Sequence, residues 1–365
     1  MNSSNNTRKH YLDNIRWITV VIVVIYHVFY MFNGEGILGT VGKITDLEVQ
    51  YYDVYQYIVY PWFMLVLFIV SGISSRIYLD KHTDKEFIKS RTTKLLVPST
   101  IGLFVFQFIQ GYFNMSFSDA FSTMNDVPKV VVYFLMLASG IGVLWYIQLL
   151  WVFSVLLVPI RKIEKNRLWN LGSKTNIVVL ILMTALIYLA AQVLNTPVIC
   201  VYRFGLYLTG FLLGYFVFSH DEVIDVLKKW LPLLAAVAVA LGTAFCVVNF
   251  GGQYADAPAN RTLLFTSYAW FMSLTVLGFG AKFLDFQNDF TSWMGRHSWG
   301  LYIFHYLGIS IVGLYIGKAG LLPPIFTYIL ALIAGFAAGY ILYEIISRIP
   351  FFRWAVLGIK KDKRT

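Results

Sequence analysis

The sequence predicts an all-α integral membrane protein with about ten transmembrane helices and both termini in the cytoplasm. Hydrophobic residues make up 58% of the 365 residues and charged residues only 13%, which is about half the charged fraction of a soluble domain. The apolar residues gather in runs of about 20, the length that a helix needs to cross a bilayer. The Lys and Arg residues lie in short loops between these runs, mostly in every second loop.

Each apolar run is expected to form one span, and many aromatic residues lie near the run ends, where rings settle at the bilayer interface. The predicted spans are 14–32, 57–77, 95–113, 141–160, 176–194, 198–218, 231–250, 263–283, 298–316 and 324–347. The stretch from Pro128 to Ile160 is too long for one untilted span. Ser139 and Gly140 are therefore expected to separate a short re-entrant or interfacial helix at 129–138 from the fourth span.

The distribution of Lys and Arg predicts the side that each loop faces. With the amino terminus inside, 23 of the 29 Lys and Arg residues fall in cytoplasmic segments and 4 in outer segments. This excess sets the orientation and supports an even number of spans. The net charge of +10 is explained by topology, so nucleic acid is not an expected partner.

No soluble domain or long linker interrupts the spans, so residues 1–365 are expected to form a single transmembrane domain. The polar amino terminus has no cleavable-signal pattern. The two cysteines, Cys200 and Cys246, lie in apolar runs without CxxC or Cys/His spacing. This favours packing roles over a disulfide, and no metal is expected.

Ionisable residues inside a span mark candidate sites, because desolvating them is costly. The first span holds Asp13, Arg16 and His27. Arg16 and His27 are 11 residues apart, so they share one helix face with an axial separation of about 16.5 Å. Asp13 precedes Arg16 by three residues and lies on the same face. Alternatively, His27 only packs against its neighbours and Arg16 only reaches toward the interface.

The ninth span repeats this pattern. His305 lies seven residues after Ser298, which places it on the same face and about 10 Å from the inner boundary. Two histidines within the membrane suggest proton transfer or a ligand site. The other polar residues at depth are Gln148, Arg203 and Glu344. As alternatives, Arg203 only reaches the outer interface and Glu344 only pairs with Arg348, its i+4 neighbour.

A basic patch follows the second span in the segment FIKSRTTKLLVP. Arg91 and Lys94 are three residues apart and lie on one helix face just before Pro98. At the mouth of a cavity such side chains suit phosphate binding. The alternative is that these charges only set the membrane topology.

Together these residues resemble the acyltransferase family 3 membrane proteins, especially the glucans biosynthesis protein C-like branch and related surface-polysaccharide O-acyltransferases. The resemblance rests on six segments in order along the chain: LDNIRWITVVIVVIYH with Arg-x10-His spacing, FIVSGISSRIYL, FIKSRTTKLLVP, GVLWYIQLL, YRFGLYLTGFLLGY and GRHSWGLYIFH. Two positions depart from the family pattern. Val143 stands where many members carry His, and Lys94 replaces an Arg, which keeps the charge but loses the bidentate fork.

The resemblance implies a membrane-bound O-acyltransferase that takes an acyl group, acetyl or succinyl, from cytoplasmic acyl-coenzyme A. The acceptor would be a hydroxyl of a glycan or another molecule at the outer face. Acyl-coenzyme A would serve as co-substrate without a metal. The protein would be a multi-pass component of the plasma or inner membrane, in a largely bacterial family, and its sequence is compatible with a homo-oligomer.

Within this reaction, His27 is expected to act as general base on the acceptor hydroxyl, because imidazole exchanges protons near neutral pH. The alternative is that His27 carries the acyl group as a covalent acyl-imidazole. Asp13 would orient Arg16, and His305 would orient groups in the same cavity. The expected phosphate-binding residues are Arg16, Arg91 and Lys94, and the expected substrate-binding residues are Trp145, Arg203 and Tyr302. Arg16 and His27 are expected to open into one cavity that is reached from the cytoplasm.

Two other classes of protein fit the same composition. A transporter or flippase for a surface-polymer precursor would use His27, His305 and Arg203 as a proton or substrate path. Such proteins often carry inverted repeats or paired broken spans, and none is evident in this sequence. A structural subunit of a surface-polymer machine would use its buried polar groups only to bind helices together.

Overall fold

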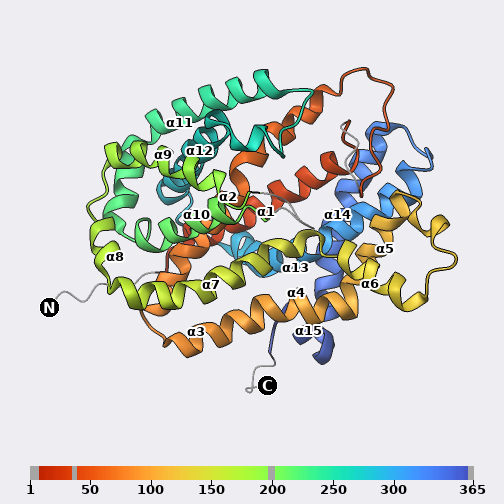
Figure 1. The fold of residues 1–365 in the computed structure, drawn as a ribbon, viewed down its shortest axis with the longest axis horizontal. Helices are drawn as coiled ribbons and strands as arrows, with labels where there is room; N and C mark the ends of the chain where they lie inside the picture. Colours follow the sequence, from red (N-terminus) through yellow and green to blue (C-terminus); the bar gives the residue numbers. More distant parts are fainter. Residues whose placement is uncertain (1–7, 35–38, 196–201, 361–365) are drawn as a thin grey trace.

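The apolar runs fold into helices, the structure that satisfies every backbone polar group within a segment in a lipid environment. The computed structural model describes residues 8–34, 39–195 and 202–360. The α-helices are α1 (His10–Met31), α2 (Val54–Leu79), α3 (Asp84–Arg91), α4 (Val97–Gly102), α5 (Phe108–Phe117), α6 (Lys129–Ser139), α7 (Trp145–Glu164), α8 (Arg167–Gly172), α9 (Ile177–Gln192), α10 (Phe204–Phe216), α11 (Asp221–Asn249), α12 (Leu263–Phe283), α13 (Asp289–Val312), α14 (Pro324–Arg348) and α15 (Pro350–Leu357) (Figure 1). Short 3-10 helices are η1 (Tyr51–Asp53), η4 (Ala120–Thr123), η5 (Gly142–Leu144) and η6 (Ala259–Arg261), and π-helical turns are η2 (Thr92–Leu96), η3 (Leu103–Gln107) and η7 (Gly313–Gly317). Cys200 lies outside the described residues, and Cys246 is a free thiol.

The all-α membrane fold is confirmed. Within the described residues, 8 helical segments are long and apolar enough to cross a membrane, and no strand is present. The predicted fifth and sixth spans correspond to α9 and α10, which have only 16 and 13 residues. At 1.5 Å per residue, α10 is about 20 Å long, shorter than the hydrocarbon core of a bilayer.

The third span differs from its predicted bounds, whereas the short helix predicted before the fourth span is present. The third span is part of a continuous helical segment of 34 residues, Asp84–Phe117, which the π-turns η2 and η3 interrupt. Such turns recur at functional sites because the extra residue shifts side chains around the helix. The short helix expected at 129–138 is present as α6, and it packs on α5 and ends before Gly140.

Contacts between the helix ends agree with the predicted alternation of the spans. Segments predicted to lie inside bond to one another: Lys9 to Asp221, Tyr11 to Asp285, and Trp169 to Ser219. Segments predicted to lie outside do the same: Tyr57 to Gly252, Gln192 to Arg261, and Tyr328 to Phe32. The bundle therefore has two rims, which we call the inner rim and the outer rim.

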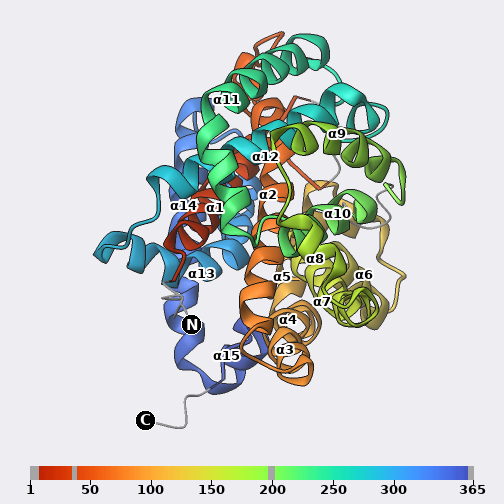
Figure 2. The same ribbon diagram turned by 90° about the vertical axis from the view of Figure 1, so that its left-hand side faces the viewer.

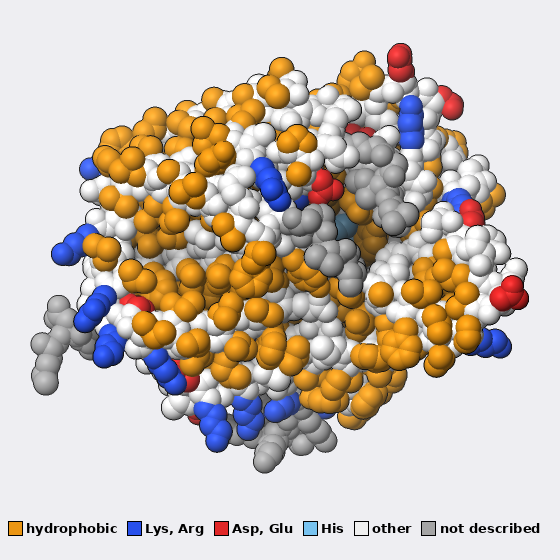
Figure 3. Space-filling view, in the orientation of Figure 1, with side chains coloured by type: hydrophobic (Ala, Val, Ile, Leu, Met, Phe, Trp, Pro, Cys, Tyr) orange, Lys and Arg blue, Asp and Glu red, His pale blue; other side chains and the backbone are white. Residues whose placement is uncertain are grey.

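The surface shows the same polarity. In Figure 3 hydrophobic side chains cover the middle of the visible face, whereas Lys and Arg gather along its left and lower edges. The Asp and Glu side chains visible at the upper right belong to the opposite edge. An apolar belt between two charged edges is the arrangement expected of a protein embedded in a bilayer.

Helix α2 is the central element, and its tight crossing with α10 depends on glycine. A Cβ on Gly72 would lie 2.0 Å from the carbonyl oxygen of Phe211, and one on Gly214 would lie 2.1 Å from that of Ile69. No larger side chain fits while the two backbones are this close. The crossing holds the serine-bearing end of α2 beside the inner rim, where Figure 2 also shows α3, α4 and α15 gathered at the lower end.

Candidate active site

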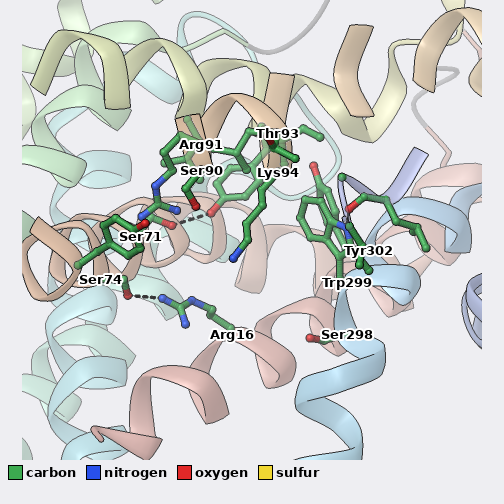
Figure 4. A pocket seen from close by; sticks show the side chains of 18 of the residues that line it. Arg16, Ser71, Ser74, Ser90, Arg91, Thr93, Lys94, Ser298, Trp299 and Tyr302 are labelled. Atoms are coloured by element: carbon green, nitrogen blue, oxygen red, sulfur yellow. Dashed lines mark hydrogen bonds between the residues drawn. The ribbon is translucent and has the colours of Figure 1, made fainter. Parts of the chain in front are cut away.

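A cavity of about 960 Å³ enters the bundle from the inner rim. Its walls come from α1, α2, α3, η2, α7, α13, α14 and the chain that follows α15. The distant segments 16–20 and 357–360 therefore share one cavity. Its lining combines apolar and aromatic side chains, such as Trp299 and Tyr302, with charged ones, such as Arg16 and Arg91 (Figure 4).

The cavity is strongly basic. The basic residues among its described lining are Arg16, Lys89, Arg91, Lys94, Arg296 and Lys360, and the single acidic one is Glu86. Glu86 is already engaged, because its carboxylate accepts the backbone N–H of Thr83 in the capping box of α3. A ligand with several negative charges is the natural occupant of such a surface.

Arg16 is held at the cavity wall by two groups. Its Nη1 lies 2.8 Å from Oδ1 of Asp13, so the pair predicted from their spacing is present. Its Nη2 donates to the hydroxyl of Ser74 on α2. The two bonds fix the guanidinium plane while leaving the side chain 35% exposed in the cavity.

Arg91 and Lys94 lie on the facing wall. Arg91 donates to the hydroxyl of Ser75 at 3.1 Å and stands over the ring of Phe87. Lys94 belongs to the π-turn η2 and is exposed. Figure 4 shows the nitrogen ends of Arg16, Arg91 and Lys94 directed into one shared space.

Three aromatic side chains of the lining, Tyr146, Trp299 and Tyr302, form what we call the aromatic layer. Tyr302 donates to the carbonyl oxygen of Val143, stacks on Trp299 with ring centroids 5.7 Å apart, and contacts the ring of Tyr146. Tyr146 in turn bonds to the hydroxyl of Ser71 at 3.0 Å. Val143, which departs from the family pattern in its side chain, contributes its backbone carbonyl at this layer.

Two imidazoles meet just beyond this layer. His305 follows Tyr302 by three residues on α13, and His27 follows the cavity-lining Val20 by seven residues on α1. Nε2 of His305 lies 3.0 Å from Nδ1 of His27, across 278 residues of sequence. The two histidines found separately in the first and ninth spans therefore form one pair.

The backbone determines which nitrogen of each imidazole carries the proton. Nδ1 of His305 lies 2.8 Å from the carbonyl oxygen of Leu301, and Nδ1 of His27 lies 2.9 Å from that of Val23. A carbonyl only accepts, so both Nδ1 atoms carry hydrogen. The single Nδ1–H of His27 is then shared between the carbonyl of Val23 and Nε2 of neutral His305, which leaves the lone pair of His27 on Nε2. No described residue bonds to that nitrogen, so it is available to act as a base.

The expectation that Arg16 and His27 open into the same cavity holds only for Arg16, because His27 is not part of the cavity lining. His27 is half-buried among the rings of Tyr26, Tyr30 and Tyr306. A side chain that only packs has no need of a second imidazole on its Nδ1, so the pair favours a chemical role.

Other predicted residues lie elsewhere. Of the three predicted substrate-binding residues, Tyr302 lines the cavity, whereas Trp145 stacks on Tyr207 and Arg203 is buried near the outer rim. Gln148 bonds to the hydroxyl of Tyr202 and the carbonyl of Ser99. Glu344 pairs with Arg348, as its spacing allowed, and also with His297.

Several cavity residues were missed in the sequence. Ser74, which lines the cavity, and the buried Ser75 beside it hold the two guanidinium groups, and neither was named as a candidate in the segment FIVSGISSRIYL. Ser74 is three residues after Ser71, so helical spacing offered a signal for it. No signal in the sequence indicated that the chain after α15 lines the cavity, because its place depends on how the last helix folds back.

Comparison with known proteins identifies the class. Residues 9–344 match the acyltransferase family 3 model, described as an acyltransferase domain, so the chain belongs to this family of membrane acyltransferases. The match favours the enzyme over the transporter and structural-subunit alternatives.

A particular relative extends the match. Over 392 residues the chain is 24% identical to the glucans biosynthesis protein C of Shigella boydii serotype 4 (strain Sb227), covering 100% of this chain and 98% of that protein. No solved structure matches the chain.

Proposed function

We propose that this membrane acyltransferase transfers an acyl group, acetyl or succinyl, from cytoplasmic acyl-coenzyme A to a hydroxyl of an acceptor at the outer face. One observation carries the proposal: a basic cavity that enters from the inner rim is lined by Tyr302, one helical turn before His305, whose imidazole pairs with that of His27. The proposed acceptor is a glycan, and the name of the glucans biosynthesis relative supports this choice.

The donor would bind with its phosphates among the basic side chains of the rim. Arg16 and Arg91 are each oriented by a serine hydroxyl, so they lose little freedom when they bind an anion. The thin arm that carries the thioester would extend along α1 toward the aromatic layer. For the arm to reach His27, the Tyr302 side chain would leave its bond with the Val143 carbonyl.

The transfer step would begin at Nε2 of His27, which takes the proton of the acceptor hydroxyl as the oxygen attacks the thioester carbonyl. A C–O bond forms and the C–S bond breaks. The imidazolium then returns the proton to the leaving thiolate, so the histidine ends as it began. His305 accepts from Nδ1–H of His27 and holds the ring in the productive tautomer, which is the role of the orienting group in catalytic triads.

The acceptor would approach from the outer rim, since the donor occupies the inner cavity. The rings around His27 and the tyrosines of the outer segment before α2 are suited to stacking against sugars. The cell's plasma or inner membrane is the proposed location, because only there does one face meet cytoplasmic acyl-coenzyme A and the other meet surface glycans.

The test uses purified full-length protein in lipid nanodiscs. Acetyl- and succinyl-coenzyme A are supplied with glucan oligosaccharides, and both free thiol release and the mass of the oligosaccharide are measured. The expected result is equal amounts of thiol and acylated product. If neither donor gives thiol release or an acylated product, the proposal is overturned.

A further inference from the structure

The chain that follows the last membrane helix folds back onto the inner rim. Helix α15 ends in an αL motif, in which the N–H of Gly358 bonds to the carbonyl of Trp354, and the N–H of Ile359 also bonds to the carbonyl of Arg353. Gly358 has φ +65°, the left-handed conformation that this ending requires. The motif turns Leu357–Lys360 toward the cavity, where all four residues form part of its lining.

Gly358 packs directly on the π-turn that carries Lys94. A Cβ at this position would lie 2.4 Å from the carbonyl oxygen of Thr93 and 2.9 Å from Cα of Lys94. Those neighbours are backbone atoms, which cannot move aside as a flexible side chain does. The absence of a side chain at Gly358 therefore sets how closely the carboxy-terminal chain approaches η2.

A second bond ties the same chain to α13. The indole N–H of Trp299 donates to the carbonyl oxygen of Leu357 at 3.0 Å. Trp299 lines the cavity and stacks on Tyr302 in the aromatic layer. The carboxy-terminal chain thus joins η2, which carries the basic group, to the helix that carries His305.

The last described residue adds a charge. Lys360 lines the cavity mouth and is exposed, and no described residue bonds to its amino group. With Lys89, Lys94 and Arg296, it extends the basic surface outward from the inner guanidinium pair. A long anionic ligand would meet this outer group first.

We propose that Leu357–Lys360 is a donor-binding element: Gly358 positions the π-turn and its Lys94, and Lys360 binds a phosphate of the acyl-coenzyme A donor. This inference rests on the proposed function. It assigns the carboxy-terminal chain a part in substrate affinity, whereas its basic residues by themselves would be explained by membrane topology.

The test measures coenzyme A binding by isothermal titration calorimetry, with full-length protein in nanodiscs at low and high salt. For Lys360→Gln we expect affinity to fall roughly two- to fivefold at low salt and less at high salt, as for an exposed ion pair. For Gly358→Ala we expect a loss of roughly tenfold that persists at high salt, because strain at a left-handed position and the contact with Thr93 displace Lys94.

Two control variants match these changes. Lys229→Gln removes an exposed lysine of α11 that is not part of the cavity lining. Gly320→Ala places a side chain at φ +62° with nothing within 4 Å. Both are expected to bind coenzyme A like the wild type.

The outcomes separate the two proposals. In one outcome, the unmodified protein binds coenzyme A, and Lys360→Gln and Gly358→Ala both keep its affinity. That result overturns the role of the carboxy-terminal chain and leaves the proposed function standing. If Gly358→Ala does not fold, Lys360→Gln alone decides whether the carboxy-terminal chain binds the donor. This variant changes only an exposed side chain, so it is expected to fold. If the wild type does not bind coenzyme A, both the proposed function and the role of the carboxy-terminal chain are overturned.

Discussion

The inner and outer ends of the helix bundle use their arginines in opposite ways. At the inner rim, Arg16 is 35% exposed and faces a basic cavity. Near the outer rim, the side chain of Arg203 is only 2% exposed, and its guanidinium donates to Tyr60 and to the carbonyl of Ala255, close to Asp256. One guanidinium is available to a ligand, whereas the other is used within the fold.

The surroundings extend this contrast. The outer loop after α11 packs into the bundle through Tyr254, which is fully buried and bonds to Gln56 and to Tyr26, the residue beside His27. At the inner end, the corresponding space is open. The comparison teaches that the inner end is open to a ligand, whereas at the outer end a buried polar network ties the loop after α11 to α1 and α2.

The largest effect is expected where the two ends meet, at His27. Replacing a general base lowers the rate by about 10²- to 10⁴-fold, so His27→Ala is expected to reduce thiol release by that factor and leave coenzyme A binding intact. The measurement is initial thiol release in nanodiscs, with His10→Ala as a histidine control. Wild-type turnover in His27→Ala would refute the base assignment.

The next effect tests whether the outer arginine is structural. Arg203→Met removes hydrogen bonds from a buried charged group, which typically contribute about 1.5–3 kcal/mol each. The free energy of unfolding should therefore fall by about 2–4 kcal/mol, while surviving folded protein binds coenzyme A normally. Thermal unfolding in detergent, followed by binding, checks this. Unchanged stability together with lost acceptor acylation would assign Arg203 to the substrate instead.

At the inner arginine we expect a smaller effect, and we expect it on substrate binding instead of on stability. Arg16→Ala removes a charge-assisted contact to the donor, so the KM for acyl-coenzyme A should rise about tenfold. Stability should change by less than about 1 kcal/mol, because the pair with Asp13 is solvent-exposed. Steady-state kinetics and thermal unfolding of one preparation give both values. A large loss of stability without a change in KM would reverse the proposed contrast between the two ends.

The smallest effect sharpens the same comparison at the serines. Ser74→Ala and Ser75→Ala each remove one hydroxyl that orients a guanidinium. A neutral hydrogen bond of this kind contributes about 1 kcal/mol, so KM should rise roughly two- to fivefold with kcat unchanged. Ser118→Ala, at an outer turn away from the cavity, is the control. A fall in kcat at constant KM would place these hydroxyls at the reacting atoms.

The sequence by itself determined the membrane bundle, the alternation of its loops and the Asp13–Arg16 pair. Hydrophobic run length, charge distribution and helical spacing are local properties, so they can be read without knowing which helices touch. It also identified His27 and His305 as separate buried imidazoles.

Only the tertiary structure decided that these imidazoles meet, that Arg203 bonds within the fold, and that His27 lies outside the lining of the cavity. It also brought Gly358 onto the π-turn of Lys94. The physical reason is that helical periodicity gives the face on which a side chain lies, whereas the packing of distant helices decides what that face meets.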